Sequence, residues 1–233
     1  MSRPRVKLLT PFVGGKLPDY LPDFARRAGD VGIVDWELLQ FDHVEALNQL
    51  MTDRLGTPCR KESGYAASDI RPMLADAFPG TVGGYEWWGW VETDVVLGDL
   101  DRLLPPLLDR HDAISMFPDA VSGPLMLFRN DSACNGLYRR GDWQWVLAEP
   151  SYCNYEETQG AHVAGFHKDG GMTRLLRWSG LRVHWDAGGS RWPEFPNGAP
   201  PYTCRLENGR LLETPGDGEL MIYHFNHTKR WPL

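Results

Sequence analysis

The apolar residues of the first 130 positions alternate between the two-residue spacing of strands and the 3.6-residue spacing of helices. Residues 44–55 show the helical pattern clearly, and Gly56 and Pro58 end it. The strands predicted in this way are 5–12, 31–41, 87–97, 113–117 and 123–129, and the helices are 18–28, 44–55, 69–78 and 100–110. This alternation predicts an α/β fold with a mixed central sheet flanked by helices.

The last hundred residues are less regular and contain more Gly, Pro and Trp. Strands are expected there at 181–185 and 219–225. No repeat, low-complexity tract or linker divides the chain of 233 residues. We therefore expect a single domain with an irregular C-terminal half.

Composition and charge narrow the class of protein. Hydrophobic residues make up 42% of the chain and charged residues 24%, which excludes a disordered chain. The net charge of −7 argues against a broad nucleic-acid-binding face, which needs clustered Lys and Arg. We find no membrane-spanning run and no signal peptide, and we expect the four cysteines to be free thiols in a reducing cytoplasm.

The ten tryptophans are unusual for this length, and several are clustered, as at 87–90, 143–145 and 178–192. Single tryptophans usually fill a core. Clustered ones also provide flat apolar surfaces of the kind that sugar rings stack on. The clusters are therefore compatible both with core packing and with a carbohydrate ligand.

Glu92 and Asp94 interrupt an apolar strand close to its end at Gly98. Side chains two residues apart in a strand face the same side, so the two carboxylates are expected to converge. A divalent cation such as Mg²⁺ or Mn²⁺ would relieve their repulsion. The alternative is an acidic pair that faces solvent.

Five short segments, in the same order, resemble a small bacterial glycosyltransferase family with the GT-A fold, found in capsule and exopolysaccharide gene clusters. The central one, WGWVETDVVLGDL at 88–100, resembles the family's W-G-x-x-D-x-D-x-x-x-G-D-L segment. The other four are PFVGGKLPDY at 11–20, SDIRP at 68–72, SGPLMLFRN at 122–130 and YEE at 155–157.

The resemblance implies a GT-A-like domain over 1–233, with a nucleotide-sugar-binding half at 1–130 and an acceptor half at 131–233. It implies that Glu92 and Asp94 hold Mn²⁺ or Mg²⁺ against the donor diphosphate, with Glu92 in place of the family's first Asp. The remaining donor-binding residues that it implies are Phe12, Gly14, Lys16, Asp69, Arg71 and Asn130.

The C-terminal segment HFNHTKRW at 224–231 is similar to the H-F-x-G-x-x-K-P-W signature of retaining GT-A enzymes, although it lacks the Gly and Pro. The similarity implies that His224 is a third metal ligand and that Lys229 contacts the diphosphate. His227 is an equal rival to His224. Imidazole suits transition metals, and Lys pairs well with phosphate.

Glu156 and Glu157 stand where the family has an F-D-E motif. A carboxylate there would deprotonate an acceptor hydroxyl or stabilise the reacting sugar. The alternative is a pair of surface acids. The family's base-binding Asp has no clear counterpart in the compressed 31–48 segment, where Asp35 and Asp42 are the candidates.

The expected function is transfer of a hexose from a nucleotide diphosphate sugar, with a UDP-sugar favoured, to a carbohydrate or natural-product hydroxyl. A peripheral association with membranes stays open. The alternative is a non-catalytic sugar-binding or degenerate transferase-like protein. A glycoside hydrolase is disfavoured, because Glu92 and Asp94 are too close together for the inverting form.

Overall fold

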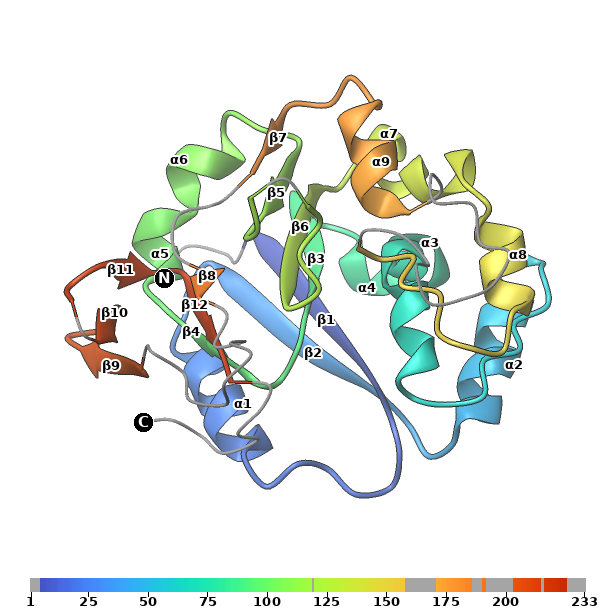
Figure 1. The fold of residues 1–233 in the computed structure, drawn as a ribbon, viewed down its shortest axis with the longest axis horizontal. Coiled ribbons are helices and arrows are strands. Elements are labelled where there is room, and N and C mark those ends of the chain that lie inside the picture. The colour runs from blue at the N-terminus through green and yellow to red at the C-terminus, as the bar shows by residue number, and fades with distance from the viewer. Residues whose placement is uncertain are drawn as a thin grey trace, which may run out of the picture.

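The computed structural model describes residues 5–118, 120–157, 171–185, 190–191, 203–214 and 216–225. Its centre is a mixed six-stranded sheet in the order β2-β1-β3-β6-β5-β7 (Figure 1). The strands are β1 (Val6–Val13), β2 (Val34–Phe41), β3 (Trp87–Val91), β5 (Ala113–Ser115), β6 (Leu125–Arg129) and β7 (Val183–His184). β1 runs parallel to β2 and β3, while β6 runs antiparallel to both of its neighbours.

Helices cover both faces of this sheet, because the strands are apolar on both sides. Along β3, Trp88 and Trp90 pack on one face, while Trp87 and Val91 pack on the other. The first face carries α2 (Val44–Leu55), η1 (Ala66–Met73), α3 (Leu74–Ala77), α4 (Pro79–Val82), α7 (Ser132–Asn135), η2 (Leu137–Arg140), α8 (Trp143–Ala148) and α9 (Met172–Arg177). The second face carries α1 (Leu21–Gly29), α5 (Leu100–Leu103) and α6 (Pro105–Leu108).

The 87–90 tryptophan cluster is core, so it does not form the sugar-binding surface that clustering left open. Trp87, Trp88 and Trp90 are all buried, and the Trp88 ring stacks on Phe128 with centroids 5.5 Å apart. Gly89 lies between them because a Cβ there would overlap the carbonyl oxygen of Met126 in β6. The glycine therefore allows β3 and β6 to approach each other closely.

Residues 222–224, near the end of the described chain, pair with a strand from the middle of the sequence. β12 (Ile222–His224) pairs antiparallel with β4 (Val95–Leu97) and parallel with β8 (Ser190–Arg191). A further sheet contains β9 (Thr203–Glu207), β10 (Arg210–Thr214) and β11 (Glu219–Leu220). Gly98 permits this crossing, since a Cβ there would overlap the carbonyl oxygen of Leu220. Residues more than a hundred positions apart thus meet beside β4.

Several elements differ from the pattern-based expectation. The expected helix at 100–110 divides into α5 and α6, and the expected strand at 219–225 divides into β11 and β12, which join different sheets. The run at 87–97 is not one strand: it breaks at 92–94, and β3 and β4 join different sheets. The expected helix at 69–78 is a 3₁₀ segment at 66–73 followed by the short α3, with Pro72 inside the first piece. A proline removes a backbone donor, which disfavours a regular α-helix there.

None of the helices in the described residues has the length and apolar character needed to cross a bilayer.

All four cysteines are free, as their spacing predicted, and the structure shows that all four are buried. Burial raises the pKa of the Cys134, Cys153 and Cys204 thiols to about 12. A thiol with such a pKa is not a nucleophile at neutral pH. The cysteines are therefore structural.

Candidate functional site

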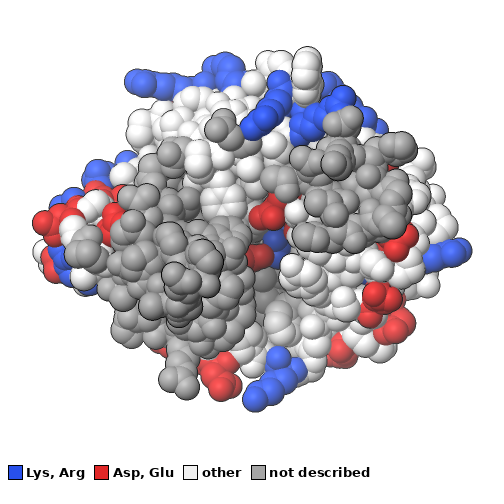
Figure 2. Space-filling view, viewed as in Figure 1, with Lys and Arg blue, Asp and Glu red and all other residues white. Residues whose placement is uncertain are grey.

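A cavity of about 850 Å³ opens beyond the carboxyl ends of β1 and β3. Ligands of open α/β sheets commonly bind in this position. Figure 2 shows acidic and basic side chains in a hollow near the middle of this face. The charged side chains that line the cavity are Arg71, Glu92, Asp94, Glu156, Glu157 and His224.

The break between β3 and β4 positions the two carboxylates. The Thr10 hydroxyl donates a 2.6 Å hydrogen bond to the carbonyl of Val91, which fixes the end of β3. The amide of Glu92 then donates to the carbonyl of Pro124 at 2.9 Å. The chain therefore turns into the cavity at Glu92 and rejoins regular structure only after Asp94.

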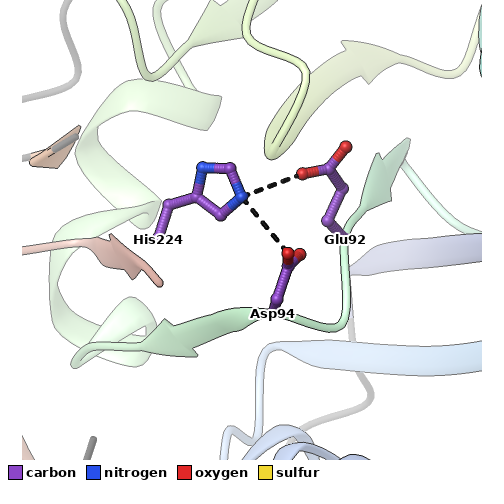
Figure 3. Close-up of side chains that lie close together, drawn as sticks. All are labelled: Glu92, Asp94 and His224. Carbon is purple, nitrogen blue, oxygen red and sulfur yellow. Dashed lines mark ion pairs between the residues drawn. The ribbon is translucent and has the colours of Figure 1, made fainter. Parts of the chain in front are cut away.

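His224 reaches the same point through strand pairing. β12 places His224 opposite Val95, and the amide of Phe225 donates to the carbonyl of Asp94 at 2.9 Å. The His224 Nε2 atom lies 3.2 Å from Glu92 Oε2 and 3.6 Å from Asp94 Oδ2 (Figure 3). One ligand atom from each residue lies within 4.8 Å of the other two.

This donor set fits a divalent cation. Two carboxylates and an imidazole suit Mn²⁺ better than Mg²⁺, which prefers oxygen ligands alone. Burial alone would lower the pKa of His224, but the Asp94 and Glu92 carboxylates outweigh it and raise that pKa to about 9. At neutral pH a proton therefore takes the place of a cation between the carboxylates, and a metal that binds there displaces it.

The two carboxylate oxygens of Glu92 have different partners, Arg71 and His224. Its Nη2 donates to Glu92 Oε1 at 2.8 Å, which leaves Oε2 on the side of His224. Burial opposes the ionisation of Glu92, but Arg71 outweighs it and lowers the pKa of that carboxyl. The glutamate side chain therefore reaches both Arg71 and His224.

Glu156 and Glu157 lie in the same cavity in different environments. Glu156 is 1% exposed, and burial raises its pKa well above the usual range despite Arg71, whose Nη1 is 3.9 Å away. The Tyr152 hydroxyl lies 2.8 Å from Asn154 Oδ1 and 2.9 Å from Glu156 Oε1. One phenol proton cannot serve both oxygens, so a protonated Glu156 fits the geometry.

The Glu157 carboxylate is held by Gly123, in the connection between β5 and β6. The amide of Gly123 donates to Glu157 Oε1 at 2.8 Å, and a Cβ at Gly123 would overlap that oxygen. Thr173 fixes the backbone of Glu157 through its amide at 2.9 Å and its hydroxyl at 2.7 Å. Burial raises the pKa of Glu157 as well. The two neighbouring glutamates therefore differ in their partners, although burial raises the pKa of both carboxyl groups.

Beneath the cavity, a buried ion pair anchors the segment that carries both glutamates. Lys61 Nζ lies 2.7 Å from Asp69 Oδ2, and both side chains are fully buried. Asp69 also accepts hydrogen bonds from the amides of Cys153 at 2.8 Å and Tyr155 at 2.7 Å. Lys61 has no sequence signal that marks it as part of this arrangement, and its position became apparent only in the structure.

The structure corrects the donor-binding role implied for Asp69. Its carboxylate is enclosed by Lys61 and two backbone amides and does not line the cavity. Asn130 is also misplaced: β6 runs antiparallel to β3, so its last residues lie at the opposite edge of the sheet, where the Asn130 amide nitrogen donates to the carbonyls of Val82 and Tyr85. Both residues have structural partners instead.

Of the other residues that the resemblance implies for donor binding, some line the cavity and others do not. Phe12 and Arg71 line the cavity, whereas Gly14 and Lys16 are absent from the described part of its wall. Asp35 lies at the start of β2, where it accepts from Tyr85 and pairs with Lys7 at 3.3 Å, and exposed Asp42 is likewise outside the wall. Lys229 and His227 lie outside the described residues.

Comparisons with known proteins give one family and no function. Residues 16–177 match the Family of unknown function (DUF6625). No curated protein and no solved structure matches the chain. The matched range contains the two carboxylates of the break, Arg71 and both glutamates, whereas His224 follows it.

Proposed function

The chain belongs to the DUF6625 family, and from its site we propose that it is a metal-dependent glycosyltransferase. The proposed reaction moves a hexose from a nucleotide diphosphate sugar, with a UDP-sugar favoured, to the hydroxyl of a carbohydrate or small molecule. The observation that carries the proposal is the convergence of Glu92, Asp94 and His224 in one cavity with Arg71 beside them. The mixed sheet with helices on both faces is compatible with a GT-A-like fold.

The donor end of the cavity has the charges that such a reaction needs. Glu92, Asp94 and His224 would hold Mn²⁺ or Mg²⁺, and the cation would offset the charge of the diphosphate leaving group. Arg71 lies at the same end. Burial would lower the pKa of Arg71, but the nearby Glu92 and Glu156 outweigh it and raise that pKa, so the guanidinium stays charged. It keeps Glu92 oriented and adds positive charge near the phosphates.

The two glutamates would serve the acceptor. Glu157, fixed by Gly123, accepts the proton of the acceptor hydroxyl. At the same time the oxygen of that hydroxyl forms a bond to the reacting carbon of the donor sugar. The bond between that carbon and the diphosphate oxygen breaks, and the nucleoside diphosphate leaves. Glu156, held protonated by burial, orients a hydroxyl by hydrogen bonding rather than by accepting its proton.

A thermal-shift screen of UDP-, GDP-, CMP- and dTDP-sugars, each with and without Mn²⁺, tests this proposal. A ligand at 100 times its Kd stabilises the native state by about 2.7 kcal/mol, which raises the Tm of a chain of this size by on the order of 5 to 10 °C. We expect one nucleotide class to give such a shift only with metal. A folded sample that responds to none of them would favour the sugar-binding or degenerate-transferase alternative.

Gly123→Ala is expected to lower sugar transfer by roughly 10²- to 10⁴-fold, the usual contribution of a positioned base. The new methyl group would occupy the place of Glu157 Oε1, and the flexible side chain would swing away. Gly80→Ala is the matched control, because nothing lies within 4 Å of a Cβ there. Activity and Tm are measured on both variants. Unchanged transfer by Gly123→Ala would remove Glu157 from the mechanism.

A further inference from the structure

Two tyrosines form a wall of the cavity that the proposed chemistry leaves unused. Tyr65 and Tyr152 both line the cavity, and their rings pack with centroids 4.5 Å apart at an angle of 55°. Tyr65 is 70% exposed, which is unusual for a large aromatic side chain with no described role in the core. Its position follows from Gly64, where a Cβ would lie 3.2 Å from that of Val13. The close approach brings Tyr65 to the rim.

Two glutamates lie beside this wall, and Arg71 lines the same cavity with its Nη1 atom 3.9 Å from Glu156 Oε1. After burial, Glu156 and then Glu157 contribute most to raising the pKa of both tyrosines, so both remain neutral phenols. Glu156 Oε2 is buried and has no hydrogen-bond partner among the described residues, although Glu156 lines the cavity. A buried carboxyl oxygen without a partner is costly unless a ligand or water pairs with it. This part of the cavity is therefore prepared to receive hydroxyl or amide donors.

We propose that Tyr65 and Tyr152 are the stacking wall of the acceptor subsite, and that the acceptor is an uncharged hexopyranoside. The inference rests on the proposed function, because it assigns the acceptor of that reaction to the part of the cavity wall formed by Tyr65 and Tyr152. The flat rings match the apolar face of a pyranose, and the carboxyl groups beside them accept hydrogen bonds from its hydroxyls. Glu157 is the ionised base in the proposed function, and its negative charge repels a uronate or a sugar phosphate at this position.

The probes are the methyl α- and β-glycosides of glucose and galactose, with methyl β-glucuronide as the matched anionic sugar. Binding is measured by saturation-transfer NMR on the full chain with saturating UDP and Mn²⁺. We expect at least one neutral glycoside to bind and the glucuronide not to bind. Tyr65→Ala should weaken the neutral glycoside by about tenfold, whereas Tyr65→Phe should retain it. Trp178→Ala, at an aromatic residue that is 80% exposed and outside the cavity wall, is the control.

The nucleotide response of the same variants separates the two proposals. A Mn²⁺-dependent UDP shift that survives Tyr65→Ala while glycoside binding is lost supports the inference. The inference is overturned if Tyr65→Ala weakens the nucleotide instead, if the glucuronide binds as well as the glucoside, or if no neutral glycoside binds. Glycoside binding that depends on Tyr65, in a chain that never responds to a nucleotide, would refute the transferase and leave a sugar-binding wall.

Discussion

Asp94→Asn is expected to abolish the metal-dependent binding of the donor nucleotide while the protein stays folded. Asp94 Oδ2 lies 3.6 Å from His224 Nε2, and Glu92 already shares its carboxylate with Arg71. Removing a partner of a metal ligand typically costs about 10- to 100-fold in affinity, so loss of the ligand itself should cost at least the upper value. Calorimetry with Mn²⁺ measures this directly, and the UDP thermal shift should disappear with it.

The fold should tolerate this change because the strand pairing at Asp94 uses the backbone. The bond from the Phe225 amide to the Asp94 carbonyl remains in the variant, and the substitution removes one of two neighbouring negative charges. His224→Ala should give the same loss of metal affinity from the other element. Asp53→Asn, on the surface of α2, is the control for the loss of a carboxylate. Full Mn²⁺ affinity in either site variant would exclude this metal centre.

The sequence predicted that the carboxylates of Glu92 and Asp94 converge, and they do, but the reason given was partly wrong. Period-two spacing was expected to place Glu92 and Asp94 on one face of a strand, yet the strand ends at Val91 and the two residues lie in the break. They converge because Thr10 and Pro124 hold the end of β3 while β12 holds Asp94. Such contacts join positions far apart in the chain, and no local spacing encodes them.

The errors have the same origin. Asn130 was assigned to the donor by its position in a motif, but the direction of β6 decides at which edge of the sheet it lies. The role of Asp69 depends on Lys61, eight positions earlier, whose side chain is fully buried. Helix α2 was predicted with its observed bounds because its periodicity and its Gly56 stop are local signals. Local patterns thus sufficed for α2, and not for the partners of Asn130 and Asp69.

Breaking the pair of Lys61 and Asp69 is expected to be the most destabilising change of a charged residue in the described structure. Lys61→Met leaves a carboxylate buried with two amide donors and no cation, and Asp69→Asn leaves a buried ammonium group. Removing one partner of a buried ion pair typically costs about 3–5 kcal/mol. Urea unfolding should show this loss in each single variant.

The double variant separates the energy of the pair from the cost of isolating a charge. Lys61→Met combined with Asp69→Asn removes both charges, so we expect it to be more stable than either single variant, with a coupling energy of roughly 1–3 kcal/mol. Arg26→Ala is the control, because Arg26 pairs with Asp23 at 3.3 Å on the surface, where such pairs contribute about 0–1 kcal/mol. Single-variant losses below about 1 kcal/mol would show that the pair is not a structural anchor.

The same variants connect stability to the site. Asp69 fixes the backbone of Cys153 and Tyr155, and Glu156 and Glu157 follow immediately. A folded Asp69→Asn protein should therefore keep its Mn²⁺ affinity, because the metal ligands come from other segments, and should lose transfer activity as the glutamates shift. Loss of metal affinity together with activity would instead indicate that the whole cavity depends on this pair.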